Sequence, residues 1–284
     1  MDVPVKEEYK KEGKPVPEKT EREKYLEAYY DRRRAKLERE LARLETEREK
    51  VIAREQRRAA ALRRDIAGVP GHFAHGLNIY KLFWVFLICC FLGVVLETVF
   101  VFATTGVLMQ RTGLVWGPFN LIYGFGAVLL TVFLYRLGGK NDRWIFAGGA
   151  LIGGAFEYFC SWLQETVIGT VSWDYSGMPF NLNGRINLLY CFFWGLLGLV
   201  WVKELYPRIS GWIERHVPNA IGISLSWVLA AFMLVNSLVS GGAVLRMAQR
   251  YEGVPAASGW QQRFDERFPD ERLARIFPSM VHVE

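Results

Sequence analysis

The stretch of sequence that decides the fold reads WIFAGGALIGGAFEYFCSWLQETVIG and runs from Trp144 to Gly169. It is long and apolar enough to cross the hydrocarbon core of a bilayer as a helix, yet it contains two carboxylates, Glu157 and Glu165. A carboxylate in hydrocarbon is costly unless it is paired, hydrated or protonated, so such residues usually face the interior of a helical bundle. The stretch therefore predicts a membrane protein with a polar centre.

Four more apolar stretches surround this one, while the charged residues concentrate before residue 67 and in short connectors. The chain is 51% apolar and 14% aromatic. Length and hydropathy predict spans at about Tyr80 to Ala103, Pro118 to Leu137, Trp144 to Ile168, Ile186 to Val202 and Ile221 to Leu245. The predicted fold class is therefore all-α: a polytopic helical membrane bundle of about five transmembrane helices with a charged N-terminal helical arm.

Composition divides the chain into five regions. We predict a disordered tail at 1–19, a charged cytoplasmic helix at 20–67, a linker and interfacial segment at 68–79, the helical membrane domain at 80–246 and an amphipathic C-terminal tail at 247–284. In the charged helix, Tyr30, Leu37, Leu44 and Val51 recur every seven residues, but the complementary heptad positions are half polar. This pattern favours a solvated charged helix, with a weak coiled coil or a partner-docking helix as the alternatives.

Positive charge in the connectors predicts the orientation. The second connector contains Arg136, Lys140 and Arg143 and the fourth contains Lys203, Arg208 and Arg215, whereas the first offers only Arg111 and the third only Arg185. The side richer in Lys and Arg is usually cytoplasmic, so the N-terminus is predicted there. Arg246 and Arg250 follow the fifth span on the opposite side, so either the rule fails locally or the span count is wrong by one.

The polar residues of the spans fall at one depth in this topology. Glu97, Glu157 and Glu165, with Asn120 and Asn187, all lie at or beyond the midplane on the non-cytoplasmic side. We therefore expect an outward-facing acidic cavity. The candidate substrate-binding residues are Glu97, Arg111, Asn120, Tyr123, Glu157, Glu165, Trp173, Asp174, Tyr175, Asn181, Asn183, Arg185 and Asn187.

Packing and solvation offer simpler interpretations for some of these positions. Asn236 is more readily explained as a residue that holds helices together, and hydration near the interface explains Glu165 equally well. Arg111 and Arg185 could pair with the carboxylates. Glycines at Gly148, Gly149, Gly153 and Gly154 predict close packing against the inner half of the third span.

Other classes of protein find little support in the sequence. His72 and His75 have no third ligand nearby, and Cys89, Cys90, Cys160 and Cys191 lie within spans as packing residues, so no metal site and no cofactor are expected. No catalytic residue is predicted, because no His or Ser sits where a nucleophilic triad would need it. The basic arm lacks interleaved aromatic residues, so nucleic acid is not an expected partner.

Several motifs together resemble a known family of bacterial multi-pass proteins, the CmpB-like (type IV) ABC-transporter permeases. The matching pieces are Gly93 to Glu97, Arg111 to Gly126, Glu157 through Glu165, Trp173 to Ser176, Pro179 to Ile186, Trp194-Gly195 and the tail around Arg272 to Pro278. The resemblance implies a transport protein of the bacterial cytoplasmic (inner) membrane. Gly138-Gly139-Lys140-Asn141 is no phosphate-binding loop, so a separate ATPase subunit would hydrolyse ATP.

Three functions remain open on the sequence. The leading hypothesis is an integral membrane transport component that handles a small polar or cationic solute in the acidic cavity. The alternatives are an intramembrane enzyme acting on a lipid or lipid-linked substrate, and a membrane scaffold that recruits a cytoplasmic partner through the charged arm. The expected partners are the lipid bilayer, a separate ATPase subunit and a second copy of the chain in a homo-oligomer.

Overall fold

The computed structural model describes residues 19–67, 71–137 and 141–282. Residues 1–18 of the predicted disordered tail, residues 68–70 of the predicted linker and Lys140 lie outside the described residues, as does the side chain of Arg136. The chain divides into a unit of residues 1–57 and a unit of residues 58–284. The helices are α2 (Glu21–Ala67), α3 (Ile79–Thr105), α4 (Leu121–Leu134), α5 (Asp142–Ile168), α6 (Leu188–Val200), α7 (Tyr206–His216), α8 (Asn219–Tyr251), α9 (Gly259–Arg267) and α10 (Asp270–Ile276).

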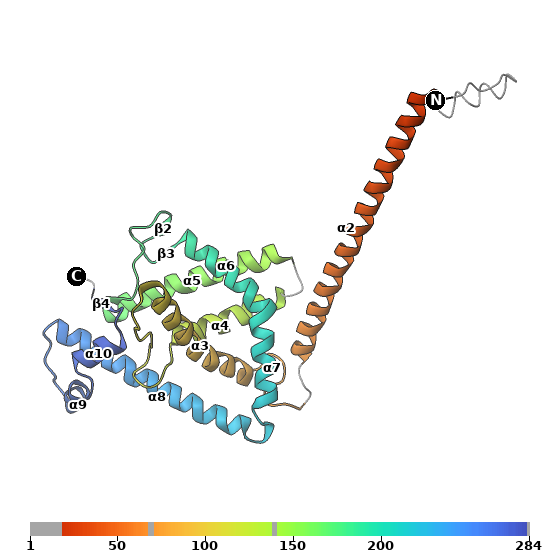
Figure 1. The fold of residues 1–284 in the computed structure, drawn as a ribbon. Coiled ribbons are helices and arrows are strands. Elements are labelled where there is room, and N and C mark those ends of the chain that lie inside the picture. The colour runs from red at the N-terminus through yellow and green to blue at the C-terminus, as the bar shows by residue number, and fades with distance from the viewer. Residues whose placement is uncertain (1–18, 68–70, 138–140, 283–284) are drawn as a thin grey trace. The chain divides into compact units, whose positions relative to one another are not determined.

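Short irregular and extended elements complete the fold. A 3₁₀ turn, η1 (Tyr135–Leu137), follows α4, and a π-helical turn, η2 (Trp201–Leu205), joins α6 to α7. Strand β1 (Thr170–Val171) pairs antiparallel with β4 (Val281–His282), and β2 (Asn181–Leu182) pairs with β3 (Ile186–Asn187). The structure is thus almost wholly helical (Figure 1).

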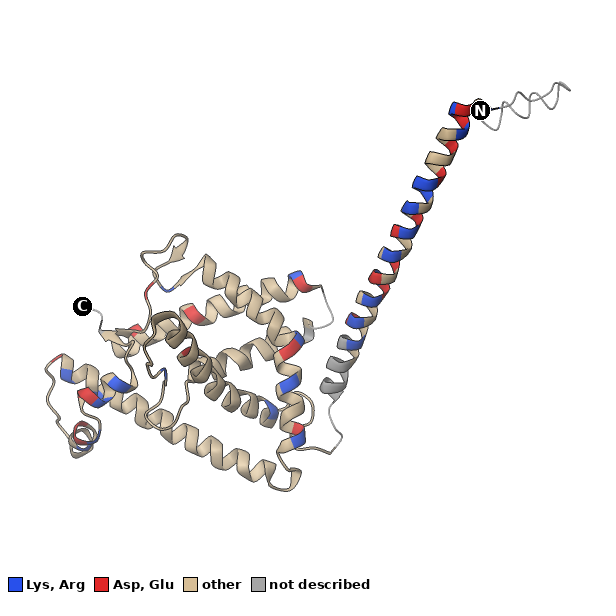
Figure 2. Cartoon of the chain, in the orientation of Figure 1, with Lys and Arg blue, Asp and Glu red and all other residues tan. Residues whose placement is uncertain are grey.

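The charged helix α2 begins where the sequence predicts it, and charges follow it along its length (Figure 2). Glu47 and Lys50 form an ion pair of 3.0 Å, as their spacing of three residues predicts. The apolar heptad residues of this helix are exposed, Leu44 by 65%. The exposed residues leave both the solvated helix and the weak coiled coil open, so the coiled coil stays a prediction.

The rest of the chain is a helical membrane bundle. Three helical segments, Ile79–Thr105, Leu188–His216 and Asn219–Tyr251, are long and apolar enough to cross a membrane on length and composition alone. Helix α4 is apolar but shorter, and α5 carries Asp142 and Arg143 in its first turn and Glu157 and Glu165 in its second half. The all-α class is confirmed.

Contacts between residues distant in sequence show which connectors lie at the same end of the bundle. At one end, the Phe73 amide donates to Asn219 Oδ1 over 2.6 Å, and Lys203 pairs with Asp142 at the start of α5. At the other end, which we call the tail end, β4 pairs with β1 and Thr112 donates to the Ile276 carbonyl. Helices α3, α4, α5, α6 and α8 therefore alternate in direction.

Glycines bring α5 and α6 close together, which confirms the packing predicted for α5. A Cβ atom added to Gly149 would lie 2.9 Å from the Trp194 carbonyl oxygen and 3.3 Å from the Cα atoms of Gly195 and Gly198. The ring of Trp194 lies against Gly153 in the same way. Because lipid is as apolar as the helix surfaces, helices associate in a membrane through close van der Waals packing, which these glycines allow.

The fourth predicted span is longer in the structure than in the sequence interpretation. A span ending at Val202 was expected, but the helix continues through η2 and α7 to His216. Pro207 directly follows the π-helical turn, and the backbone keeps helical φ and ψ angles through Leu205 and Tyr206, so the proline does not end the helix. The indole Nε1 of Trp201 donates to Thr131 Oγ1 over 2.9 Å and fixes the turn against α4.

Candidate functional site

Glu97 near the end of α3 is held by two neighbours. Its Oε1 accepts from Arg111 Nε over 2.7 Å and from Arg111 Nη2, and its Oε2 accepts from the hydroxyl of Tyr123 on α4. Arg111 also donates from Nη1 to Ser279 Oγ in the C-terminal tail. The side chains of Glu97 and Arg111 are 21% and 22% exposed, so the ion pair is largely withdrawn from solvent.

The local sequence explains how this cluster is assembled. Gly93, one turn before Glu97, lies against the ring of Tyr123, where a larger residue would push α3 and α4 apart. Asn120 caps α4 by accepting from the Ile122 amide over 3.1 Å, and its Nδ2 donates to the Arg111 carbonyl over 3.4 Å. The side of α3 that carries Gly93 and Glu97 and the side of α4 that carries Tyr123 therefore pack against one another.

The connector between α3 and α4 is irregular around Gly117-Pro118, and α4 begins only at Leu121, after the predicted start of the span at Pro118. Gly117 has a φ of +73°, a conformation that favours glycine. Asn236 on α8 accepts from the Trp116 amide over 3.2 Å and donates to the Trp116 carbonyl over 2.7 Å. This supports the packing interpretation of Asn236, although its partner is a connector rather than another helix.

Glu157 in the middle of α5 has a different environment. Its Oε1 accepts from the hydroxyl of Tyr175 over 2.7 Å, and its Oε2 accepts from the indole Nε1 of Trp194 over 2.6 Å. The ring of Tyr190 stacks on that of Tyr175 with centroids 4.5 Å apart. Burial and the bond to Glu157 raise the pKa of Tyr175, which keeps the phenol protonated as a donor.

Glu165, at the end of the same helix, pairs with Arg185. Arg185 Nη1 donates to Glu165 Oε2, and the bond raises the pKa of Arg185. The guanidinium also lies 5.8 Å from the centre of the Tyr158 ring. The side chain of Glu165 is 35% exposed, so water reaches it as expected. The ion pair with Arg185 stabilises its charge in addition.

The connector between α5 and α6 is ordered by its own polar side chains. Asp174 Oδ1 accepts from the hydroxyl and the amide of Ser176, which holds the pKa of Asp174 below its usual value. The other predicted residues of this connector also bond locally: Trp173 Nε1 to the Arg185 carbonyl, Asn181 Nδ2 to the Met178 carbonyl, Asn183 Nδ2 to Tyr158 and the Tyr190 amide to Asn187 Oδ1. These residues shape the connector beside Glu157.

Charge balance distinguishes the three glutamates. Glu97 and Glu165 each have an arginine partner, Arg111 and Arg185. Among the residues that the structure describes, Glu157 has only neutral donors. An ionised Glu157 would therefore leave one uncompensated negative charge inside the bundle.

The structure does not link Glu97 to Glu157. Within the described ranges no hydrogen bond or shared partner joins the two, and the helices that carry them both pack on α4. Two cavities of about 320 and 690 Å³ lie instead between the first connector and the C-terminal tail. A single cavity containing both glutamates stays a prediction.

Two buried ionic clusters were not foreseen. Lys81, in the first turn of α3, is fully buried and donates to Glu214 Oε1 over 2.7 Å and to Ser210 Oγ on α7. Arg246, also fully buried, forms a two-pronged ion pair with Asp265 on α9. The position of Lys81 inside a predicted span could have indicated that it needs a buried acidic partner. The second cluster joins residues that no sequence periodicity relates, so the sequence could not predict it.

The fold and these clusters define a helical membrane protein with polar groups held inside its bundle. A family model described as "Putative ABC-transporter type IV" matches residues 84–240, more than half of the chain. The chain therefore belongs to this family, as its motifs predict, and is a membrane transport component of the ABC-transporter type. The match runs from α3 to α8 and leaves α2 and the tail outside. No curated protein and no solved structure matches the chain.

Proposed function

We propose that Glu157 is the carboxylate that contacts the transported solute, and that the solute is small and cationic. The observation that carries this proposal is the charge balance: Glu157 accepts bonds from Tyr175 and Trp194 but, among the described residues, has no cationic partner. A carboxylate inside a membrane bundle usually marks a substrate or ion path. Glu97 and Glu165 are already neutralised by Arg111 and Arg185. In this proposal they hold the connectors to the helices and do not contact the solute.

The aromatic rings around Glu157 favour a cation over a neutral polar solute. Tyr175 and Trp194 bond the carboxylate, Tyr190 stacks on Tyr175, and all three rings are only half-buried. The faces of such rings attract cations, most strongly where water is excluded. A carboxylate flanked by half-buried aromatic rings suits an alkylammonium group, which carries charge and apolar surface together.

The test uses the purified full-length chain in neutral detergent and tetramethylammonium chloride as the probe. We expect the probe to raise the midpoint of thermal unfolding relative to sodium chloride at equal ionic strength. Glu157→Gln should weaken the apparent affinity at least about tenfold, because it removes the negative charge that attracts the cation. Glu165→Gln is the matched control, on the same helix but paired with Arg185. Equal affinity in the wild type and Glu157→Gln would exclude Glu157 as the contact.

We further propose five crossings, with the N-terminus on the cytoplasmic side of the bacterial inner membrane. The connectors support this, because Arg143, Lys203, Arg208 and Arg215 lie at the end of the bundle opposite to Arg111 and Arg185. An impermeant thiol reagent should label Ser176→Cys from outside intact cells and Arg208→Cys only after lysis. The reverse pattern would overturn the orientation.

ATP hydrolysis in this proposal comes from a separate subunit. Family membership supports such a partner, and the sequence has no glycine-rich loop followed by Lys and Ser or Thr. Affinity purification of the tagged full-length chain from its native cells should recover an ATPase in stable proportion. Recovery of the chain alone, under conditions that preserve its fold, would count against a permanent complex.

A further inference from the structure

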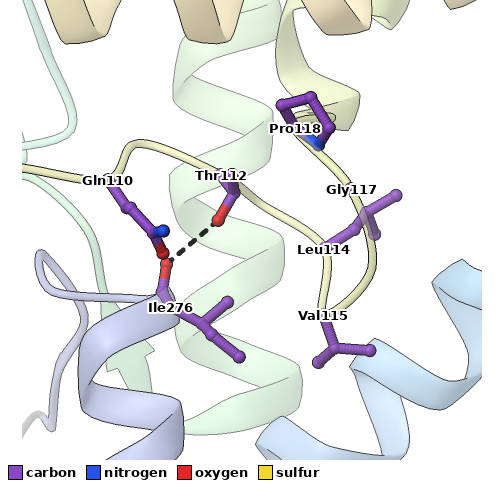
Figure 3. A pocket seen from close by; sticks show the side chains of 7 residues that line it. All are labelled: Gln110, Thr112, Leu114, Val115, Gly117, Pro118 and Ile276. Carbon is purple, nitrogen blue, oxygen red and sulfur yellow. Dashed lines mark hydrogen bonds between the residues drawn. The ribbon is translucent and has the colours of Figure 1, made fainter.

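The two cavities at the tail end form one groove. The smaller lies between the first connector and α10, and the larger continues along α10 toward Pro278. Both are lined by Gln110 and Ile276, so they adjoin there. Figure 3 shows Gln110 and Thr112 on the side of the Ile276 carbonyl, with Val115, Gly117 and Pro118 across from them. One end of the groove is thus polar and the other is largely apolar.

The larger cavity is lined by two arginines, Arg272 and Arg275. Among the residues that the structure describes, no carboxylate lies within ion-pair distance of either guanidinium. Arg272 Nη1 donates to the Arg267 carbonyl and Arg275 Nε donates to the Glu271 carbonyl. A guanidinium has five N–H donors, so most remain available on each side chain. The groove therefore offers positive charge and donors to an anionic ligand.

The acidic residues of α9 and α10 form no ion pair with these two arginines among the described residues. Asp265 is engaged by Arg246 and Arg250, Asp270 is engaged by Arg250, and Glu271 pairs with neither Arg272 nor Arg275. Arginine forks match the oxygens of phosphate or carboxylate with two parallel bonds. A phosphate group fits the donor set at this end.

Exposed apolar side chains stand next to the arginines. Leu108, which lines the larger cavity with Arg272 and Arg275, is 75% exposed, and Phe100 and Phe102 near the end of α3 are 66% and 53% exposed. Leu108 thus brings apolar surface to the charged end of the groove. Free phosphate would leave this surface exposed to water, whereas a phospholipid would cover it with an acyl chain.

We propose that the groove between the first connector and α10 binds an anionic phospholipid, with its phosphate at Arg272 and Arg275 and its chain along Leu108 and α3. A volume of about 690 Å³ in the larger cavity is enough for a glycerophosphate headgroup. The site is independent of Glu157 and of any transported solute. It ties the C-terminal tail and the first connector to the lipid surface.

Native mass spectrometry of the full-length chain tests the proposal, with dioleoyl phosphatidylglycerol and dioleoyl phosphatidylcholine as probes. We expect the wild type to retain one phosphatidylglycerol with an affinity about tenfold above that for phosphatidylcholine. The double variant Arg272→Gln/Arg275→Gln should lose this preference. Arg263→Gln/Arg267→Gln should keep it, because these exposed arginines of α9 carry the same charge but do not line the groove.

A second variant tests the groove itself. Gln110 is exposed and lines both cavities, so Gln110→Trp would fill the groove without disturbing the buried core. It should weaken phosphatidylglycerol binding while leaving the midpoint of thermal unfolding unchanged. Equal retention of the two lipids by the wild type would overturn the proposal, as would equal loss in the α9 control. Displacement of the lipid by millimolar inorganic phosphate would show that the site takes soluble phosphate instead.

Discussion

Lys81 shows how a single charge is accommodated inside the bundle. Its side chain is fully buried, and its ammonium bonds Glu214 Oε1, Ser210 Oγ and the Ser210 carbonyl. Glu214 is only 11% exposed, so both charges depend on one another rather than on water. Loss of one partner of a buried pair leaves an uncompensated charge, which costs more than the pair contributes.

Variants of this pair should therefore be strongly non-additive. Lys81→Met and Glu214→Leu alone should each lower stability by about 3–5 kcal/mol, because each strands a buried group. The double variant should recover most of this loss, since both charges are then gone. The measurement is the midpoint of thermal unfolding in detergent. Additive losses in the double variant would show that packing, rather than charge pairing, explains the single effects.

At the scale of elements, small residues determine how α5 meets α6. Gly149 approaches Gly195 and Gly198 closely, and the two helices make the most extensive contact in the bundle. Gly241 on α8 offers a contrast, because a Cβ atom added there would meet nothing within 4 Å. The same substitution should thus have opposite effects at the two positions.

Gly149→Ala should lower the midpoint of thermal unfolding, because the new methyl group would press on the Trp194 carbonyl at 2.9 Å. Gly241→Ala should leave the midpoint unchanged or raise it slightly, since alanine favours a helix over glycine by roughly 0.5–1 kcal/mol. Both changes are measured in the same detergent. A larger loss at Gly241 than at Gly149 would contradict the packing account.

The sequence predicts the elements better than it predicts their contacts. Apolar length alone places α3 and α8, and the glycines of α5 predict its close packing. The sequence also indicates that Arg111 and Arg185 pair with carboxylates, because the predicted topology places them at the same depth in the membrane as Glu97 and Glu165. The donors of Glu157 could not be predicted, since Tyr175 and Trp194 reach it from a connector and from another helix. Their positions depend on the tertiary fold.

At the scale of the whole bundle, the C-terminal tail joins three segments distant in sequence. Asp265 and Asp270 hold it to the end of α8, Ser279 bonds Arg111 in the first connector, and β4 pairs with β1 after α5 (Figure 1). Phe268 and Leu273 bury their side chains against Val115 and Ala243. The tail therefore packs as part of the domain, and the amphipathic pattern of its sequence is satisfied by protein contacts.

Docking of the tail should depend on acid pH through Asp265. The bonds from Arg246 and Arg250 hold the pKa of Asp265 below its usual value of 3.8. A carboxyl group whose pKa is depressed by folding stabilises the fold above its unfolded pKa and loses that contribution as pH falls through the folded pKa. Docking should then be constant from about pH 8 to pH 5 and weaken below about pH 4. Hydrogen exchange of residues 259–282, corrected for the intrinsic effect of pH, measures this.

Asp265→Asn should reproduce the acid effect at neutral pH. It leaves the buried Arg246 without its counterion, so amide protection in α9 and α10 should fall about tenfold or more, while protection in α3 changes little. The variant should also lose the step below pH 4 that the wild type shows. Glu266→Gln is the matched control, because Glu266 is an exposed acid on the same helix and, among the described residues, forms no ion pair. If Glu266→Gln loosened the tail as much as Asp265→Asn, general charge on α9, rather than the bond to Arg246, would hold it in place.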